Sequence, residues 1–302
     1  MRRSVSADIR DGNRWRVTYG ESDGYMQNPV VTTVLGAAAF VLGATVGSFL
    51  NVCIFRMPRG ESIVFPGSHC LSCGTPVRWY DNIPIVSYFI LQGRCRRCGT
   101  HFSAQYPLIE FMTAALFLCV YLKFSVTLAT PVYWALIGAL VVVTWIDLYY
   151  YIIPNRITVT GVVAGLLLSV LAYVLPSSGL LVRSPVNALV GVLLGAGILY
   201  LADMFAVVFL NKAGMGGGDL KLLAMLGAFL GWKMILPILF VASIIGSAVG
   251  IPVLMLRRKK QGPSSHYIPF GPYLAAAGVL MLFFGNHLLE WWAALSSTEP
   301  GY

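Results

Sequence analysis

Charged residues are scarce in this sequence. Of its 302 residues, only 11% are Asp, Glu, Lys or Arg, which is about half the share of an average soluble domain. By contrast, 57% are hydrophobic and the mean hydropathy is +0.75. These values exclude a soluble globular protein of this length. We expect no internal repeat and no low-complexity stretch, and a GxGxxG motif is absent too, so no local sequence fingerprint reveals a cofactor pocket.

Long apolar segments dominate instead. Several of them approach the roughly 20 residues that cross a bilayer, and they are too many and too long to be one cleavable signal peptide. The sequence predicts an all-α polytopic membrane protein with about eight transmembrane helices, the sixth of which is short enough to be a half-span. The expected spans are 30–55, 108–127, 130–149, 157–176, 186–210, 220–232, 234–256 and 270–293.

Basic residues collect in the loops on one side of these spans. The 56–107 insert, the 150–156 turn, the 211–219 loop and the run Arg257–Lys260 share one face, and they hold most of the 21 Lys and Arg residues. The positive-inside rule makes that face cytoplasmic. Because the net charge of +9 resides in these loops, it reports topology and does not indicate a nucleic-acid partner.

The N-terminal tail conflicts with this topology, because it falls on the outer face but carries five arginines. We expect translation to start at Met26, or residues 1–25 to be a disordered arm. The expected organisation is a tail (1–29), a first transmembrane helix (30–55), a cytoplasmic domain (56–107), a membrane domain (108–295) and a C-terminal tail (296–302). The arginines of the tail are Arg2, Arg3, Arg10, Arg14 and Arg16.

Four cysteines stand in the polar insert as two CxxC pairs, "HCLSCG" and "GRCRRCG". Two such pairs at this spacing can complete a tetrahedral metal site, and thiolates favour an ion such as zinc. Four protein ligands close the site, so its role would be structural. The insert is therefore predicted to be a small zinc-ribbon-like domain between the first two transmembrane helices. The predicted ligands are Cys70, Cys73, Cys95 and Cys98.

The cysteines of this chain have other possible roles. Two disulfides or a redox pair are the alternatives, and a cytoplasmic loop disfavours stable disulfides. His69 and His101 lie nearby and could replace a ligand, although four cysteines suffice. Cys53 and Cys119 lie inside apolar segments, where a free cysteine usually packs as a small hydrophobic residue.

Two aspartates stand at the cytoplasmic ends of predicted spans. Asp147 ends the third span in "TWIDLYYYIIPN", and Asp219 opens the sixth in "MGGGDLKLLA". An aspartyl protease needs at least two carboxylates at matched depth, and these share one proton. One carboxylate accepts a proton from water, and the other protonates the carbonyl oxygen of the substrate. Taken singly, Asp219 could be a helix N-cap and Asp147 a side chain that reaches toward water.

Three glycines, Gly216, Gly217 and Gly218, directly precede Asp219. Without Cβ atoms, they predict a loop that an extended substrate backbone can approach closely. Residues 215–218 are expected to be non-helical, so that the sixth helix begins at Asp219 with its free N–H groups pointing toward the site.

Two further acids lie in or beside apolar segments. Glu110 stands at the entry of the second span, where an interfacial role is the simplest interpretation. Asp203 lies deep in the fifth span, which indicates a function, but the sequence names no partner for it.

Taken together, these motifs resemble the prepilin leader peptidases, which are GxGD membrane aspartyl proteases that are also called type IV prepilin peptidase and N-methyltransferase. The resemblance covers nearly everything from about residue 40 to 278. The matching blocks are GSFLNVCIFRMPRG (47–60), DNIPIVSYFILQGRCRRCG (81–99), YPLIE (106–110), DLYYYIIPN (147–155), GMGGGDLKLLAMLGAFLGW (214–232) and IPFGPYLAAAG (268–278).

The resemblance implies two reactions at the cytoplasmic face of the bacterial inner membrane. The first cuts off the basic leader of a type IV prepilin or type II secretion pseudopilin after a glycine, and the second methylates the new N-terminal amine with S-adenosylmethionine. It implies that Asp147 and Asp219 are catalytic, that the four cysteines bind zinc, that 56–107 is the methyltransferase part and that 108–295 is the peptidase domain.

Two other interpretations stay open. The chain could be a peptidase that does not methylate, although the complete tetracysteine insert argues against this. It could also be a proton-coupled transporter in which Asp147, Asp203 and Asp219 form a relay, because transporters use broken helices and membrane carboxylates.

Overall fold

A computed structural model describes residues 29–211, 216–258 and 269–296. The Met26 start and nearly all of the expected N-terminal and C-terminal tails lie outside these ranges, and Pro29, expected as the last residue of the N-terminal tail, begins the first helix. Within them the structure is helical, and the only β pairing is two isolated bridges in the polar insert.

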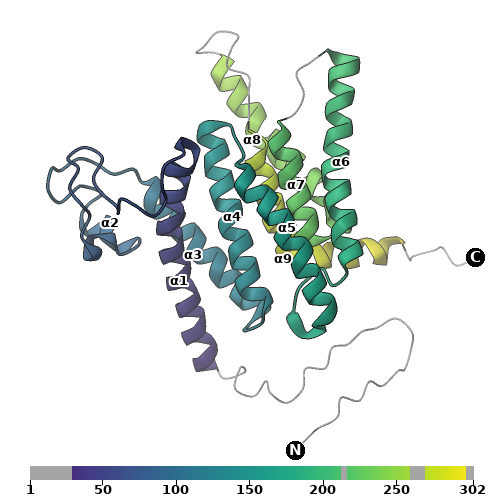
Figure 1. The fold of residues 1–302 in the computed structure, drawn as a ribbon, viewed down its shortest axis with the longest axis horizontal. Helices are drawn as coiled ribbons and strands as arrows, with labels where there is room; N and C mark the ends of the chain where they lie inside the picture. Colours follow the sequence, from purple (N-terminus) through teal and green to yellow (C-terminus); the bar gives the residue numbers. More distant parts are fainter. Residues whose placement is uncertain (1–28, 212–215, 259–268, 297–302) are drawn as a thin grey trace, which may run out of the picture.

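The membrane part of the described chain consists of long helices (Figure 1). In the described part of the chain, seven helices are long and apolar enough to cross a membrane, whereas α7 has 14 residues and would span only about 21 Å. The prediction of an all-α membrane protein with about eight membrane helices and a short sixth one is confirmed. The membrane helices, including the short α7, are α1 (Pro29–Arg56), α3 (Gln105–Phe124), α4 (Ala129–Tyr150), α5 (Asn155–Val174), α6 (Pro185–Leu210), α7 (Gly217–Leu230), α8 (Ile235–Arg258) and α9 (Gly271–Ser296).

Short helical elements fill the connections. They are η2 (Met57–Arg59), η3 (Trp79–Asn82) and α2 (Val86–Ile90) in the polar insert, and η4 (Pro176–Ser178) and η5 (Trp232–Met234) between long helices. The insert lies beside α1 as a small irregular domain (Figure 1). It enters the chain between the first two membrane helices, as the sequence predicts.

Glycines set the contact between α1 and α3. A Cβ on Gly43 would lie 2.7 Å from the Cα of Ala114, and a Cβ on Gly47 would lie 2.7 Å from the Cα of Glu110. Small residues let helix backbones approach this closely in a membrane, where apolar side chains gain little by leaving lipid. The two helices run antiparallel, because the contact moves back along α3 as it moves forward along α1.

The same device joins α6 to α7. A Cβ on Gly191 would lie 2.3 Å from the carbonyl oxygen of Gly227, and a Cβ on Gly195 would lie 2.7 Å from that of Leu223. Neither position has room for a larger residue, since the atoms opposite are backbone. The ends of α1 and α4 and the starts of α3, α7 and α9 lie at one end of the bundle (Figure 1).

Outward-facing side chains are apolar. Leu193, Leu201 and Phe205 on α6 are 62%, 66% and 56% exposed, respectively. A surface of this kind is stable against lipid but not against water. The structure therefore supports membrane embedding by its exposed residues as well as by helix length.

A sharp reversal follows α4. Tyr151 adopts φ +55°, which is uncommon for a residue with a side chain. Pro154 is the extended residue directly before α5, and its missing N–H is no loss at a helix start. The turn is held at the end of the bundle where Asp147 lies.

Candidate active site and metal centre

Two buried carboxylates come together at this end of the bundle. Asp147 belongs to the last turn of α4 and Asp219 to the first turn of α7, and each residue is only 5% exposed. The two groups are close enough to interact as like charges. The structure thus unites the two aspartates that the sequence singled out, from helices far apart in the chain.

Asp219 is not a helix N-cap, and Asp147 is not a side chain that reaches toward water. The N-cap of α7 is Gly216, and no side chain caps the helix, so Asp219 is not an N-cap. Asp147 is buried and does not reach toward water. Asp219 Oδ1 is buried without a hydrogen-bond partner among the described residues. Such an unpaired buried atom is costly, which favours a functional reason for keeping it.

A third helix holds Asp147 in place. The backbone N–H of Gly271, the first residue of α9, donates a hydrogen bond to Asp147 Oδ2 over 3.0 Å. A Cβ at this position would lie 2.6 Å from the same oxygen, so the approach requires glycine. Gly271 was not among the predicted site residues, although its segment "IPFGPY" belongs to a block that resembles the family. The sequence feature that could have pointed to Gly271 is its position as a glycine at the start of the last predicted span.

The turn after α4 connects the same helices. Ile153 packs between two glycines: a Cβ on Gly218 would lie 2.7 Å from Ile153 Cβ, and one on Gly271 would lie 3.0 Å from Ile153 Cδ1. Close by, Lys221 Nζ donates a hydrogen bond to Asn155 Oδ1 over 2.8 Å. These contacts fix the start of α7 against the turn and so fix the position of Asp219.

The glycine segment differs from the prediction. The α7 helix begins at Gly217, so the expected start at Asp219 is wrong and two of the glycines are helical. Gly216 is extended, with φ −63° and ψ 129°, whereas Met215 lies outside the described residues. Glycine disfavours helix by about 1 kcal/mol, but the packing of Gly218 on Ile153 offsets this preference. Tight packing therefore explains Gly218, while a Cβ on Gly217 would meet open space.

The four predicted cysteines form one cluster. Their Sγ atoms all lie within 4.8 Å of one another, and the Sγ atoms of Cys70 and Cys98 are 3.7 Å apart. A zinc ion with bonds to sulfur of about 2.3 Å in a tetrahedron places its ligands about 3.8 Å apart. The cluster therefore fits zinc with little adjustment. All six cysteines lie in the described ranges, and none forms a disulfide.

Each CxxC pair has the same local structure. The N–H of the first cysteine donates to the carbonyl of the threonine five residues on, over 2.9 Å from Cys70 to Thr75 and 2.8 Å from Cys95 to Thr100. A glycine with positive φ, 67° at position 74 and 72° at position 99, makes each turn possible. The unit CxxCGT is thus a short internal repeat, which corrects the expectation that the chain has none.

The threonines favour the metal-binding form of the cysteines. Thr100 Oγ1 lies 3.3 Å from Cys98 Sγ, and this hydrogen bond lowers the pKa of Cys98 to about 6. Thr75 likewise lowers the pKa of Cys73. Because the thiolate is the form that binds metal, these hydrogen bonds favour metal binding by both CxxC pairs.

The sequence of this chain matches the models of two protein families. Residues 41–124 match the model of the Bacterial Peptidase A24 N-terminal domain, and residues 134–251 match that of the Type IV leader peptidase family. The chain belongs to the type IV leader peptidase family. The predicted family and enzyme class are confirmed, and membership argues against the transporter alternative.

Curated relatives carry the same description, "Prepilin leader peptidase/N-methyltransferase". The relative from Myxococcus xanthus (strain DK1622) is 39% identical over 74% of this chain and 64% of its own length. Those from Aeromonas salmonicida (strain A449) and Pseudomonas putida are 33% and 32% identical, over 84% and 83% of this chain and 92% and 91% of their own lengths. No solved structure matches the chain.

Two other acids of the chain have different surroundings. Glu110 is only 8% exposed, and its Oε2 accepts a hydrogen bond from the N–H of Ile85 over 2.7 Å, so it does more than mark an interface. Asp203 lies half-buried on α6, and its Oδ1 has no hydrogen-bond partner within the described part of the chain. Cys53 packs in the core as expected, whereas Cys119 is exposed, so the packing role predicted for it is wrong.

Proposed function

We propose that this protein removes the basic leader of type IV prepilins or type II secretion pseudopilins and then N-methylates the new N-terminal residue. The observation that carries the peptidase part is the buried pair Asp147 and Asp219, with a backbone N–H of α9 aimed at one of the two carboxylates. The activities themselves are those that the relatives' names state.

The two aspartates have different roles in this proposal. The N–H of Gly271 favours the ionised carboxylate at Asp147, so Asp147 accepts a proton from the attacking water. Asp219, with its unpaired Oδ1 beside that negative charge, holds the shared proton and donates it to the scissile carbonyl oxygen. The pair then returns a proton to the leaving amine, which completes hydrolysis.

The helix directions support cleavage at the cytoplasmic face of the inner membrane. Both aspartates and both ends of the 56–107 insert lie at the same end of the bundle, and this end carries most of the loop Lys and Arg residues. A pilin whose apolar segment lies in the bilayer would present its basic leader at that surface. Residues 108–295 would form the peptidase domain.

We assign the cysteine cluster to one structural zinc ion, bound by Cys70, Cys73, Cys95 and Cys98. All four positions of a tetrahedral ion are then occupied by protein, so the metal would hold the insert together and would not activate water. The insert, 56–107, would carry the methyltransferase part, with S-adenosylmethionine as the methyl donor.

The test is the mass spectrum of a prepilin after incubation with membranes that contain this protein. Without S-adenosylmethionine, we expect loss of the leader only; with it, we expect the same product plus one methyl group. A prepilin with valine in place of the glycine before the cleavage point is the matched control and should stay intact. No cleavage of several different prepilins would contradict the proposal, and cleavage without methylation would leave a peptidase alone.

A further inference from the structure

A cavity of about 450 Å³ lies between the 56–107 insert, the C-terminal part of α1 and the first turns of α3. This volume is within the range of small-molecule sites, which is about 300–1,000 Å³. Asn51 and Phe55 of α1, Tyr106 and Glu110 of α3, and loop residues of the insert line it. The catalytic aspartates do not line it, so it is a separate site.

A strained loop and a carboxylate meet in this cavity. Ile85 adopts φ +63° and ψ −55°, a conformation that is an outlier for a β-branched residue. Its N–H is held by Glu110 Oε2 over 2.7 Å, across the space between the insert and α3. Backbone strain of this kind persists where the surroundings enforce it, and it clusters at ligand sites.

A second acceptor in the cavity is unused. Asn51 is 3% exposed, and its Nδ2 donates to the carbonyl oxygens of Gly47 and Tyr106 over 3.3 and 3.2 Å. These donations fix the amide orientation, so Oδ1 faces away from both carbonyls. Oδ1 has no hydrogen-bond partner among the described residues. A buried amide oxygen of this kind is suited to a donor group supplied by a ligand.

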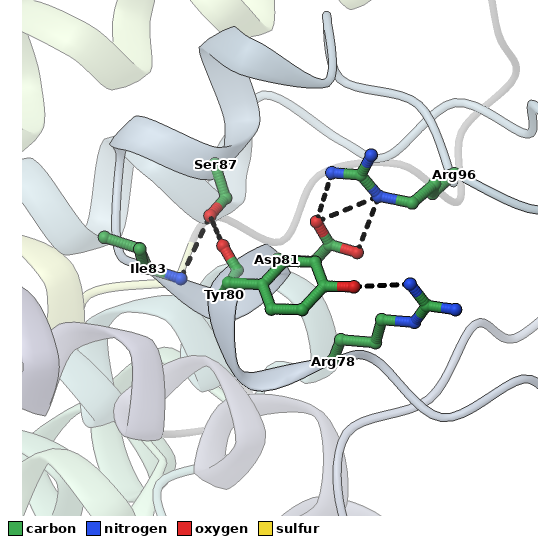
Figure 2. A network of polar contacts seen from close by, with 6 residues as sticks. All are labelled: Arg78, Tyr80, Asp81, Ile83, Ser87 and Arg96. Atoms are coloured by element: carbon green, nitrogen blue, oxygen red, sulfur yellow. Dashed lines mark hydrogen bonds and ion pairs between the residues drawn. The ribbon is translucent and has the colours of Figure 1, made fainter.

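A polar network keeps the loop that carries Ile83 and Ile85 in place. Figure 2 shows the Arg96 guanidinium paired with both oxygens of Asp81, with Nε 2.9 Å from Oδ2 and the terminal nitrogen 2.6 Å from Oδ1. In the same view, Ser87 accepts the N–H of Ile83 and donates to the carbonyl of Tyr80. Asp81 is thus neutralised by arginine, which leaves Glu110 as the cavity carboxylate without a cationic partner in the described structure.

We propose that this cavity is the methyl-transfer site, and that Glu110 binds the new N-terminal ammonium of the pilin and takes its proton. This inference rests on the proposed N-methylation. Asn51 Oδ1 would accept a hydrogen bond from the amine or from the methyl donor. The ligand class is S-adenosylmethionine together with a peptide amine.

The chemistry needs a neutral amine. An α-ammonium group has a pKa near 8, so it is mostly protonated at neutral pH and cannot attack until a base removes its proton. S-adenosylmethionine supplies the methyl group: the amine lone pair forms the N–C bond, the C–S bond breaks with its electron pair left on sulfur, and S-adenosylhomocysteine leaves. Glu110 then carries the proton to solvent.

A hydrogen bond links the helix that carries Asp147 to the start of α3, next to the cavity. The Tyr149 hydroxyl, in the last turn of α4, donates to Gln105 Oε1 over 2.8 Å, and Gln105 directly precedes the cavity residue Tyr106. A new pilin N-terminus released at the aspartates would therefore have a neighbouring acceptor site. The other titratable groups that line the cavity are Asp81, His69, His101, Tyr88, Tyr106 and Cys70.

Glu110→Gln tests the proposal, because the glutamine Oε1 can still accept the Ile85 N–H while the charge is lost. We expect prepilin cleavage, zinc content and S-adenosylhomocysteine binding by calorimetry to be retained. Methylation of a pre-cleaved pilin should fall about tenfold at neutral pH, because about a tenth of an amine with a pKa near 8 is neutral there, and it should recover toward about pH 9, where the amine loses its proton unaided. Glu61→Gln, an exposed glutamate of the same domain, is the matched control.

Val52→Trp, which fills the α1 side of the cavity, tests its location. This variant should lose S-adenosylhomocysteine binding while it keeps cleavage and zinc. The assignment is overturned if Glu110→Gln methylates like the wild type at neutral pH, if its cleavage is lost together with methylation, or if Val52→Trp binds S-adenosylhomocysteine normally. A wild-type protein that cleaves but never methylates refutes the proposed methylation itself, which is a distinguishable failure.

Discussion

Replacing Gly271 by alanine should disable the peptidase without unfolding the protein. The added Cβ would lie 2.6 Å from Asp147 Oδ2, whereas ordinary contact begins at 3.4 Å, so the carboxylate must retreat by the difference of 0.8 Å. A misplacement of about 1 Å in an active site can reduce the rate about a hundredfold. Alanine is the better helix former by about 1 kcal/mol, so the thermal unfolding temperature should stay near that of the wild type.

The assay measures leader removal from a prepilin in detergent, alongside methylation of a pre-cleaved pilin. We expect Gly271→Ala to lose cleavage about a hundredfold and to keep methylation, because neither Asp147 nor Gly271 lines the cavity proposed for methyl transfer. Gly197→Ala is the control: it adds the same methyl group to a helix in this membrane bundle, but its Cβ meets nothing within 4 Å. Cleavage by Gly271→Ala within about threefold of the wild type would refute the proposed positioning of Asp147.

Three further predictions concern stability and metal. Purified protein should contain one zinc per chain, and a strong chelator should remove it and make the 56–107 insert sensitive to protease; metal far below one equivalent would contradict the assignment. Gly191→Ala should destabilise the protein by about 1–3 kcal/mol in detergent unfolding, because its Cβ would lie 2.3 Å from the Gly227 carbonyl oxygen; unchanged stability would refute the α6–α7 packing. Tyr133→Phe should lower the free energy of unfolding by about 1–3 kcal/mol in the same assay, since the buried Tyr133 hydroxyl accepts the N–H of Leu181 over 2.8 Å. Unchanged stability would show that this N–H finds another acceptor.

The aspartates and cysteines were accessible from sequence because they stand out chemically. In a chain with so few acids, Asp147 and Asp219 at span ends are conspicuous, and paired CxxC motifs have few other uses. The positions of the membrane helices followed from apolar runs of membrane length. These features are local, so the rest of the fold was not needed to see them.

What the sequence did not reveal depends on contacts between distant segments. Gly271 meets Asp147 through a backbone N–H, which has no residue-type signature. The start of α7 at Gly217 depends on how Gly218 packs on Ile153, which overrides the helix-breaking tendency of glycine. The cavity at Glu110 is formed by α1, α3 and the insert together, so no single motif could have predicted it.

The measurement that tests the central claim most directly is the mass spectrum of a prepilin incubated with Asp147→Asn, Asp219→Asn or Asp203→Asn protein. The two-aspartate account predicts that the first two variants leave the leader intact, although they retain zinc and bind the methyl donor. Asp203→Asn, a third membrane aspartate outside the pair, should still release the leader. Leader removal by either Asp147→Asn or Asp219→Asn at a rate near that of the wild type would contradict the two-aspartate mechanism.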